Sequence, residues 1–419
     1  MNFKQLQKHN SRDDLFVCIH GRAYDVTDFQ HKHPGGYRVF NAVGGTDATQ
    51  AFVNYHPKWV YKMLRKYDKG AIKDYKPYKD EFAAELIQLR RELVRRGLFN
   101  TNYWYYFGQA IWLSYLFSGA MYFTLATPWV KFGAFLMGCY WQQVAFYGHD
   151  TNHSAVTHNR TADFLVGIII GNTTGGIGCG WWRHTHFVHH TIPNSMEHDI
   201  DNMHLPIFAV DRMVKEGFFS EFHQRDFKFT KLAAFLVSWQ HWTYYPVMAL
   251  ARINLYAQTI IFLASKEKTD YRKLETVTIS IFWIGILLLL NSLDSYFDCL
   301  IWMVISTAIS GVLEIQVTLS HYAEHSYSGK PETDWFRTQI STTLDIDCPW
   351  WQDWLHGSLN QQTAHHLWPR MPRHNLREAT TELKRVCKKH DVKYNSLGFV
   401  DANIRLIKHL KRVADASKY

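Results

Sequence analysis

The sequence lacks three signals that would narrow its class at once. Its six cysteines are scattered over 419 residues without a CxxC pair, which argues against a disulfide framework and favours soluble parts that face a reducing cytosol. The formal charge is +9, but there is no basic stripe or nucleic-acid motif. The charge is therefore expected on a solvated surface or against anionic lipid, and nucleic acid is not expected as a partner. No cleavable signal peptide is expected, because the first residues, Met-Asn-Phe-Lys, are polar.

Apolar residues make up 47% of the chain although 20% of it is charged, so the apolar residues must lie in blocks. Such blocks predict membrane-spanning helices, and 16 Trp and 23 Tyr fit the aromatic belts of membrane interfaces. The predicted spans are residues 103–126, a second helix that ends at Gly148, 277–294 and 297–319. A stretch rich in Gly and Thr over 164–178 is expected to be buried or re-entrant, and 231–264 is expected to form interfacial helices.

The distribution of basic residues predicts the orientation of these spans. Basic residues are dense before residue 100, whereas the first short loop offers only Lys131, so the N-terminus is expected in the cytosol. Two hairpins would return the chain to the same side. The basic segment 376–419 is expected to be a cytosolic tail, either solvated or lying against anionic headgroups.

Residues 1–75 predict a small soluble domain with short strands and turns. Within it, His33-Pro34-Gly35-Gly36 is followed 23 residues later by His56, a pair that could place two imidazoles across a flat cofactor. The run from Tyr24 through Gly36, then Gly45-Thr46-Asp47-Ala48-Thr49, Phe52 and His56, resembles the cytochrome b5 haem-binding domain. This resemblance implies that His33 and His56 are the axial ligands of haem b. With both positions filled, the haem would serve as an electron carrier.

Residues 76–102 are charged and predict a linker. Leucines recur there at helix-like intervals, at 86, 89 and 93. They predict an amphipathic helix that either lies on the membrane surface or is solvated.

Three histidine clusters follow the apolar blocks. In each, the spacing places the side chains on one face of a helix, which is how a helix presents metal ligands. A single histidine is usually a hydrogen-bonded core or surface residue, but three such groups in one chain predict one metal centre. The clustered residues are His149, His153, His186, His189, His190, Gln362, His365 and His366.

Seven clustered imidazoles exceed the four ligands that one zinc ion usually takes. They suit two nitrogen-ligated iron ions that keep positions open for oxygen. Together with the apolar blocks, the clusters resemble the membrane fatty acid desaturases with three histidine boxes. The Gln in the third box, His-His-Leu-Trp-Pro after it and the fused haem domain resemble the front-end branch. The implied fold is multi-domain, with a small α+β cytochrome b5-like domain followed by an all-α, multi-helix integral membrane di-iron domain over residues 103–375.

The resemblance leaves some ligands open. It implies one additional ligand after the last span, His321, with His325 as a competitor four residues on. Gln362 could bind iron directly, through water, or only by hydrogen bonding. His184 and Asp150 are expected to support the ligands rather than to bind metal.

The resemblance also implies an activity. Electrons from NADH-cytochrome b5 reductase would pass through the haem to a di-iron centre that uses O2 to remove two hydrogens from a fatty acyl chain, carried on coenzyme A or in a phospholipid. The product would be a cis double bond between an existing one and the carboxyl end, in polyunsaturated fatty acid biosynthesis at the endoplasmic reticulum membrane. The alternatives are a sphingolipid long-chain-base desaturase, a hydroxylase, and a non-catalytic haem- or lipid-binding membrane protein.

Overall fold

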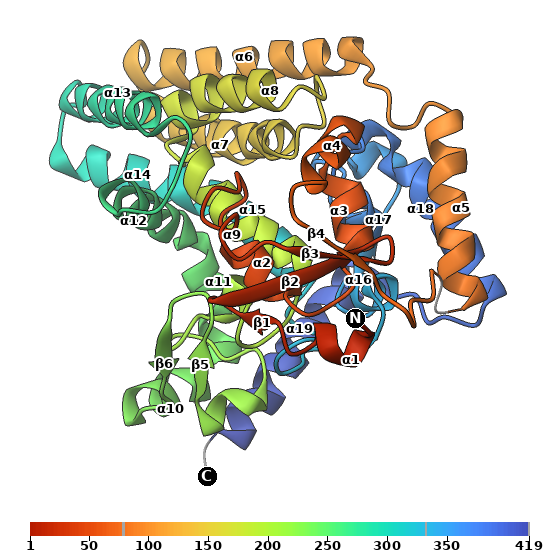
Figure 1. Ribbon diagram of the computed structural model, residues 1–419. Helices are drawn as coiled ribbons and strands as arrows, with labels where there is room; N and C mark the ends of the chain where they lie inside the picture. The colour runs from red at the N-terminus through yellow and green to blue at the C-terminus, as the bar shows by residue number, and fades with distance from the viewer. Residues whose placement is uncertain (78–79, 332, 418–419) are drawn as a thin grey trace.

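The computed structural model describes residues 1–77, 80–331 and 333–417 (Figure 1). Positions 78 and 79 of the predicted linker and the last two residues of the predicted tail lie outside these ranges. The N-terminal part forms a four-stranded sheet of order β1-β2-β3-β4 with small helices beside it. Its elements are α1 (Phe3–Leu6), β1 (Asn10–Ser11), β2 (Asp14–Ile19), β3 (Arg22–Asp25), α2 (Arg38–Val43), α3 (Thr49–Tyr55), η1 (Lys58–Val60), α4 (Tyr61–Leu64) and β4 (Asp68–Ala71).

The sheet of this N-terminal unit is antiparallel throughout. Its core is the alternate inward face of β2, where Leu15 and Val17 are buried against Phe52 of α3. Cys18, on the other face of β2, is buried in a second small cluster, so the end of this strand is covered on both faces. The core holds α3 in place, and α3 ends next to His56.

The predicted linker helix is α5 (Glu81–Arg95), which begins where the Asp80 side chain accepts the Ala83 N–H. Its leucine face is neither solvated nor on the surface of the protein. Leu86, Leu89 and Leu93 are buried against α18 (Leu376–Lys389), and Figure 1 shows the two helices side by side. A partner helix that is distant in sequence therefore covers the apolar stripe.

The rest of the described chain is mainly helical. The elements before the second hairpin are α6 (Tyr103–Leu125), α7 (Val130–Asn152), α8 (Arg160–Gly167), the π-helix η2 (Ile168–Gly175), α9 (Cys179–Thr191), η3 (Ile200–Asn202), η4 (Arg212–Glu216), β5 (Phe218–Ser220), β6 (Arg225–Phe227), α10 (Lys231–Ser238), α11 (Gln240–Ala249) and α12 (Ala251–Ala264). Those that follow are α13 (Arg272–Asn291), α14 (Tyr296–Ser310), α15 (Val312–Leu319), α16 (Trp335–Ser341), β7 (Asp345–Asp347), η5 (Trp350–Gln352), α17 (Gln362–Leu367), η6 (Arg373–Asn375), α18, β8 (Ser396–Gly398) and α19 (Phe399–Ala416).

Two helical segments, 272–291 and 296–319, are long and apolar enough to cross a membrane. Two sharply bent pairs reach the same hydropathy when taken together: 160–175 with 179–191, bent by 110°, and 240–249 with 251–264, bent by 65°. The predicted first hairpin, α6 and α7, has two helices of 23 residues each. At 1.5 Å per residue each is roughly 35 Å long, which suffices to span. Tyr and Trp in α6 and polar residues in the last turns of α7 make this hairpin less apolar than the second.

The hairpins pack closely where α7 meets α14. A Cβ added at Gly138 of α7 would lie 2.8 Å from the Ser306 carbonyl oxygen and 2.6 Å from Cβ of Ile309. The absent side chain lets the two helices approach, as small residues do between membrane helices. This contact fixes the end of α7, which carries His149, relative to α14 and α15, which lead to His321.

Candidate metal centre and haem site

The structure brings all the predicted metal-binding side chains together. One group joins His149, His153, His186, His190 and His365, and a second joins His189, His321 and His366. Within each group the ligand nitrogens all lie within 4.8 Å of one another. Gln362 adjoins the second group, with its side-chain nitrogen 3.0 Å from Nε2 of His321.

Four elements deliver these histidines. The last turn of α7 carries the first pair, α9 carries the middle three, the residues after α15 carry His321, and α17 carries the last pair. The left-handed Gly176, at φ 73°, turns the chain sharply from η2 into α9. That turn keeps the middle histidines on the side of the first pair. The exposed His325 stays outside both groups, so the geometry favours His321.

The histidine nitrogens fit metal binding because several have no proton-sharing partner. Nε2 of His189 and of His366, and both ring nitrogens of His149 and of His153, are buried without a hydrogen-bond partner among the described residues. Nε2 of His190 lies 2.9 Å from Nε2 of His186. Buried polar atoms are normally satisfied, and a cation shared between these nitrogens would satisfy them.

Side chains and carbonyls behind the ligands orient the imidazoles. Nδ1 of His189 lies 2.9 Å from the Asp199 carboxylate, and Nδ1 of His366 lies 2.9 Å from the Gln339 side-chain oxygen. Nδ1 of His321 faces the carbonyl oxygen of Thr342 at 3.1 Å. Each contact holds the proton on Nδ1, which is the usual support of metal-bound histidine. Nε2 is then unprotonated; in His189 and His366 it has no partner among the described residues, and in His321 it faces Gln362.

Sequence reasoning missed Asp199 and Gln339. The acidic pair in Glu197-His198-Asp199 directly after the second cluster was the available signal for Asp199, because ligand histidines commonly donate to a carboxylate. Gln339 gives no local signal. Asp150 lies beside a ligand imidazole as expected, with Oδ1 3.5 Å from Nδ1 of His149. Its other oxygen accepts the Tyr106 hydroxyl at 2.8 Å and pairs with Arg373 at 3.1 Å.

The haem site lies in the N-terminal unit. Nε2 of His33 faces Nε2 of His56 at 3.4 Å, and the ring of His56 stacks on Phe52 with centroids 4.4 Å apart. Nδ1 of His56 donates to the Phe52 carbonyl oxygen at 3.0 Å, which leaves its Nε2 free. Burial lowers the pKa of His33 to about 3 and that of His56 to about 4. Both imidazoles are therefore neutral at pH 7, and the facing pair fits two axial ligands.

A cavity of about 490 Å³ opens from the metal groups. His149, His186, His321 and Gln362 line one part of it. Apolar side chains line another part: Val247, Met248, Leu255, Leu313 and Val317. This size and lining suit a small lipid-like molecule.

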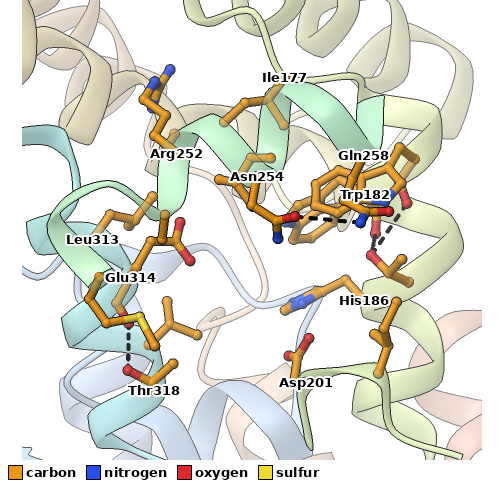
Figure 2. A pocket seen from close by; sticks show the side chains of 18 of the residues that line it. Ile177, Trp182, His186, Asp201, Arg252, Asn254, Gln258, Leu313, Glu314 and Thr318 are labelled. Atoms are coloured by element: carbon orange, nitrogen blue, oxygen red, sulfur yellow. Dashed lines mark hydrogen bonds between the residues drawn. The ribbon is translucent and has the colours of Figure 1, made fainter. Parts of the chain in front are cut away.

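Ionisable side chains also face into the cavity. Figure 2 shows the carboxyls of Glu314 and Asp201 and the imidazole of His186 directed into the same space, whereas the Arg252 guanidinium points away. The Arg252 guanidinium donates hydrogen bonds elsewhere, to the Gly175 carbonyl oxygen and the Tyr256 hydroxyl. The Glu314 carboxylate has no hydrogen-bond partner within the described part of the chain. Burial raises the pKa of Asp201 to about 6.

The facing histidines of the N-terminal unit and the two histidine groups fit an oxidoreductase in which a haem domain is joined to a metal-binding domain. Residues 126–398 match the family described as fatty acid desaturase, and residues 2–73 match the cytochrome b5-like haem/steroid binding domain. The chain belongs to the fatty acid desaturase family and carries a fused cytochrome b5-like domain. The predicted fold class, enzyme class and cofactors, haem and iron, are confirmed. Its fatty acyl substrate class and its membrane association follow from the same match.

Three relatives illustrate the range of the family. The chain is 37% identical to "Delta(8)-fatty-acid desaturase 2" of Arabidopsis thaliana, covering 98% of this chain and 92% of the relative. It is 35% identical to "Acyl-lipid (9-3)-desaturase" of Borago officinalis, covering 98% and 92%. It is 33% identical to "Delta 8-(E)-sphingolipid desaturase" of Emericella nidulans, covering 78% and 61%.

Proposed function

We propose that the chain is a front-end fatty acyl desaturase that inserts a cis double bond between an existing double bond and the carboxyl end of an acyl chain. The observation that carries this proposal is the apolar cavity that opens directly onto both histidine groups. Its reaction would use O2, with electrons from a cytochrome b5 reductase. The named activity of the Borago relative supports the proposal. We place the reaction in polyunsaturated fatty acid synthesis at the endoplasmic reticulum membrane, with both termini cytosolic and several spans between them.

We further propose that His33 and His56 hold the haem. In the same proposal the two metal groups, with Gln362 beside the second, hold two iron ions. Iron bound there supplies the oxidising power needed to break unactivated C–H bonds. The protein's part is positional. The imidazoles that line the cavity would hold the metal, and Val247, Met248 and Leu313 would hold an extended methylene chain beside it and out of water.

A second candidate is a sphingolipid long-chain-base desaturase, as in the Emericella relative. Glu314 favours it, because methylenes offer no donor to a carboxylate that faces the cavity, whereas Asp201 already lies 3.4 Å from Nδ1 of His189. A buried carboxylate without a partner is costly. A long-chain base carries an amine and hydroxyls that can donate to these oxygens.

Lipid profiling of cells that express the chain with a panel of fatty acids tests both candidates. A new double bond on the carboxyl side of an existing one supports the first. A changed sphingoid base with unchanged acyl chains refutes the first and supports the second. Glu314→Gln and Glu314→Leu sharpen the comparison. With a sphingoid base both variants should raise KM, Leu more than Gln, whereas an acyl substrate should tolerate Leu.

A further inference from the structure

The haem-domain unit docks on the outer face of α9. Arg38, the first residue of α2, places Nη1 2.5 Å from Nε2 of His184 and Nη2 2.9 Å from the Glu267 carboxylate. Its Nε donates to the Phe222 carbonyl oxygen at 2.8 Å. The Arg38 side chain is only 11% exposed, whereas that of Glu267 is 31% exposed, so the guanidinium is the shielded partner of this ion pair. We call Arg38, His184, Glu267 and Phe222 the docking contact.

His184 belongs to neither metal group, and the docking contact gives it another role. At about 100° per residue along a helix, positions 186, 189 and 190 lie roughly 140° to 240° around α9 from His184. One helix therefore presents metal-binding imidazoles on one face and a haem-domain contact on the other. Any movement of the haem domain on α9 moves it relative to the metal groups.

Tyr55 lies between the two cofactor sites. It is the residue directly before His56, and its ring meets the imidazole of His190 edge to face, with centroids 6.5 Å apart. It also contacts Phe187, at 5.8 Å. Its hydroxyl is buried and has no hydrogen-bond partner among the described residues. Because the hydroxyl bonds to nothing there, the ring makes the contact with His190 and Phe187. A phenylalanine at this position would keep the ring contacts and remove the unpaired donor.

We propose that the Tyr55 ring is the bridge through which electrons pass from the haem ligand His56 to the metal ligand His190, and that the docking contact holds this bridge closed. The proposal rests on the proposed ligand roles of these two histidines. Each transfer oxidises one ferrous haem to ferric and reduces one ferric ion of the metal pair to ferrous. One double bond takes two electrons from the substrate and two from the haem, with O2 reduced to two waters. A flavoprotein reductase must therefore re-reduce the haem twice.

The test measures the transfer of one electron from the haem to the metal pair, in the absence of substrate and O2. The haem of the purified full-length holoprotein, with its iron in the ferric state, is reduced anaerobically by a deazaflavin flash, and haem reoxidation is followed by its absorbance. Tyr55→Leu should slow reoxidation by about tenfold or more, and Tyr55→Phe should stay within about twofold of the wild-type rate. Tyr55→Met, which keeps the bulk of the side chain without a ring, serves if the Leu variant does not fold. Tyr61→Leu removes a haem-domain ring that packs on Phe52 and is the matched control.

The haem spectrum and the iron content must be unchanged in every variant compared. Reoxidation at the wild-type rate in Tyr55→Leu or Tyr55→Met overturns the bridge. Arg38→Ala should slow reoxidation and also increase hydrogen exchange of residues 179–191, and unchanged exchange overturns the docking contact. These readouts do not depend on which lipid is desaturated. A failed lipid assay together with slowed reoxidation would therefore count against the proposed substrate and not against the bridge.

Discussion

Asp199→Asn should weaken iron binding while leaving the haem in place. The Asp199 side chain is 0% exposed and lies 2.9 Å from Nδ1 of His189. It also accepts the Asn194 N–H at 2.8 Å. The carboxylate holds the His189 proton on Nδ1, and a neutral amide can present its NH2 group to that nitrogen instead. Loss of such a partner typically costs 10- to 100-fold in metal affinity, or about 1.4 to 2.7 kcal/mol.

The assay is iron per chain after equilibration against a graded series of chelator concentrations, with haem absorbance measured on the same samples. The expected result is a shift of iron retention to about 10- to 100-fold weaker chelation in Asp199→Asn. Asp163→Asn is the matched control, because Asp163 of α8 is equally buried but accepts the backbone N–H of Thr157, in the loop before that helix. Wild-type iron retention in Asp199→Asn, or equal loss in both variants, refutes the reasoning.

Three further outcomes are expected. His189→Ala should abolish desaturation and keep the haem spectrum, whereas His33→Ala should remove the haem spectrum; loss of haem in His189→Ala would contradict two separate sites. Because burial holds the pKa values of His33 and His56 at about 3 and about 4, protons compete for Nε2 only in acid. Haem absorbance should be constant from pH 8 to 5 and fall near pH 4, and a midpoint near 6.5 would refute this. Gly138→Val should destabilise the protein by about 1–3 kcal/mol through overpacking against α14, seen as a lower Tm, while Gly108→Val, at an open helix position, should not.

Spacing in the sequence predicted which histidines come together in the fold, because side chains on one helix face are a local property. His186, His189 and His190 come from one turn of α9, and the i, i+3, i+4 rule is sufficient to select them. The supporting contacts are not local. Gln339 reaches His366 from α16, a separate element, and only the folded chain shows this.

The same difference explains the linker helix. Its leucine periodicity predicted α5 correctly as a helix, but the identity of the surface that covers the leucines depended on α18, almost 300 residues away. The placement of the haem domain depended in the same way on Arg38 meeting His184. Periodicity identifies an apolar face, whereas its partner is determined by the tertiary fold.

The packing of α5 against α18 determines how the haem domain is tethered. A disordered connection would let the domain diffuse within a volume set by linker length, giving an effective concentration in the millimolar range at best. The linker is instead the folded helix α5, which is fixed against α18 by Leu86, Leu89 and Leu93 and by the ion pairs of Arg96 with Glu378 and Glu382. This packing limits how far the haem domain can move. A separate cytochrome would therefore have to compete for this face of α9 with the haem domain that already occupies it. Deleting α18 and α19 would remove this packing and leave the haem domain on a flexible connection.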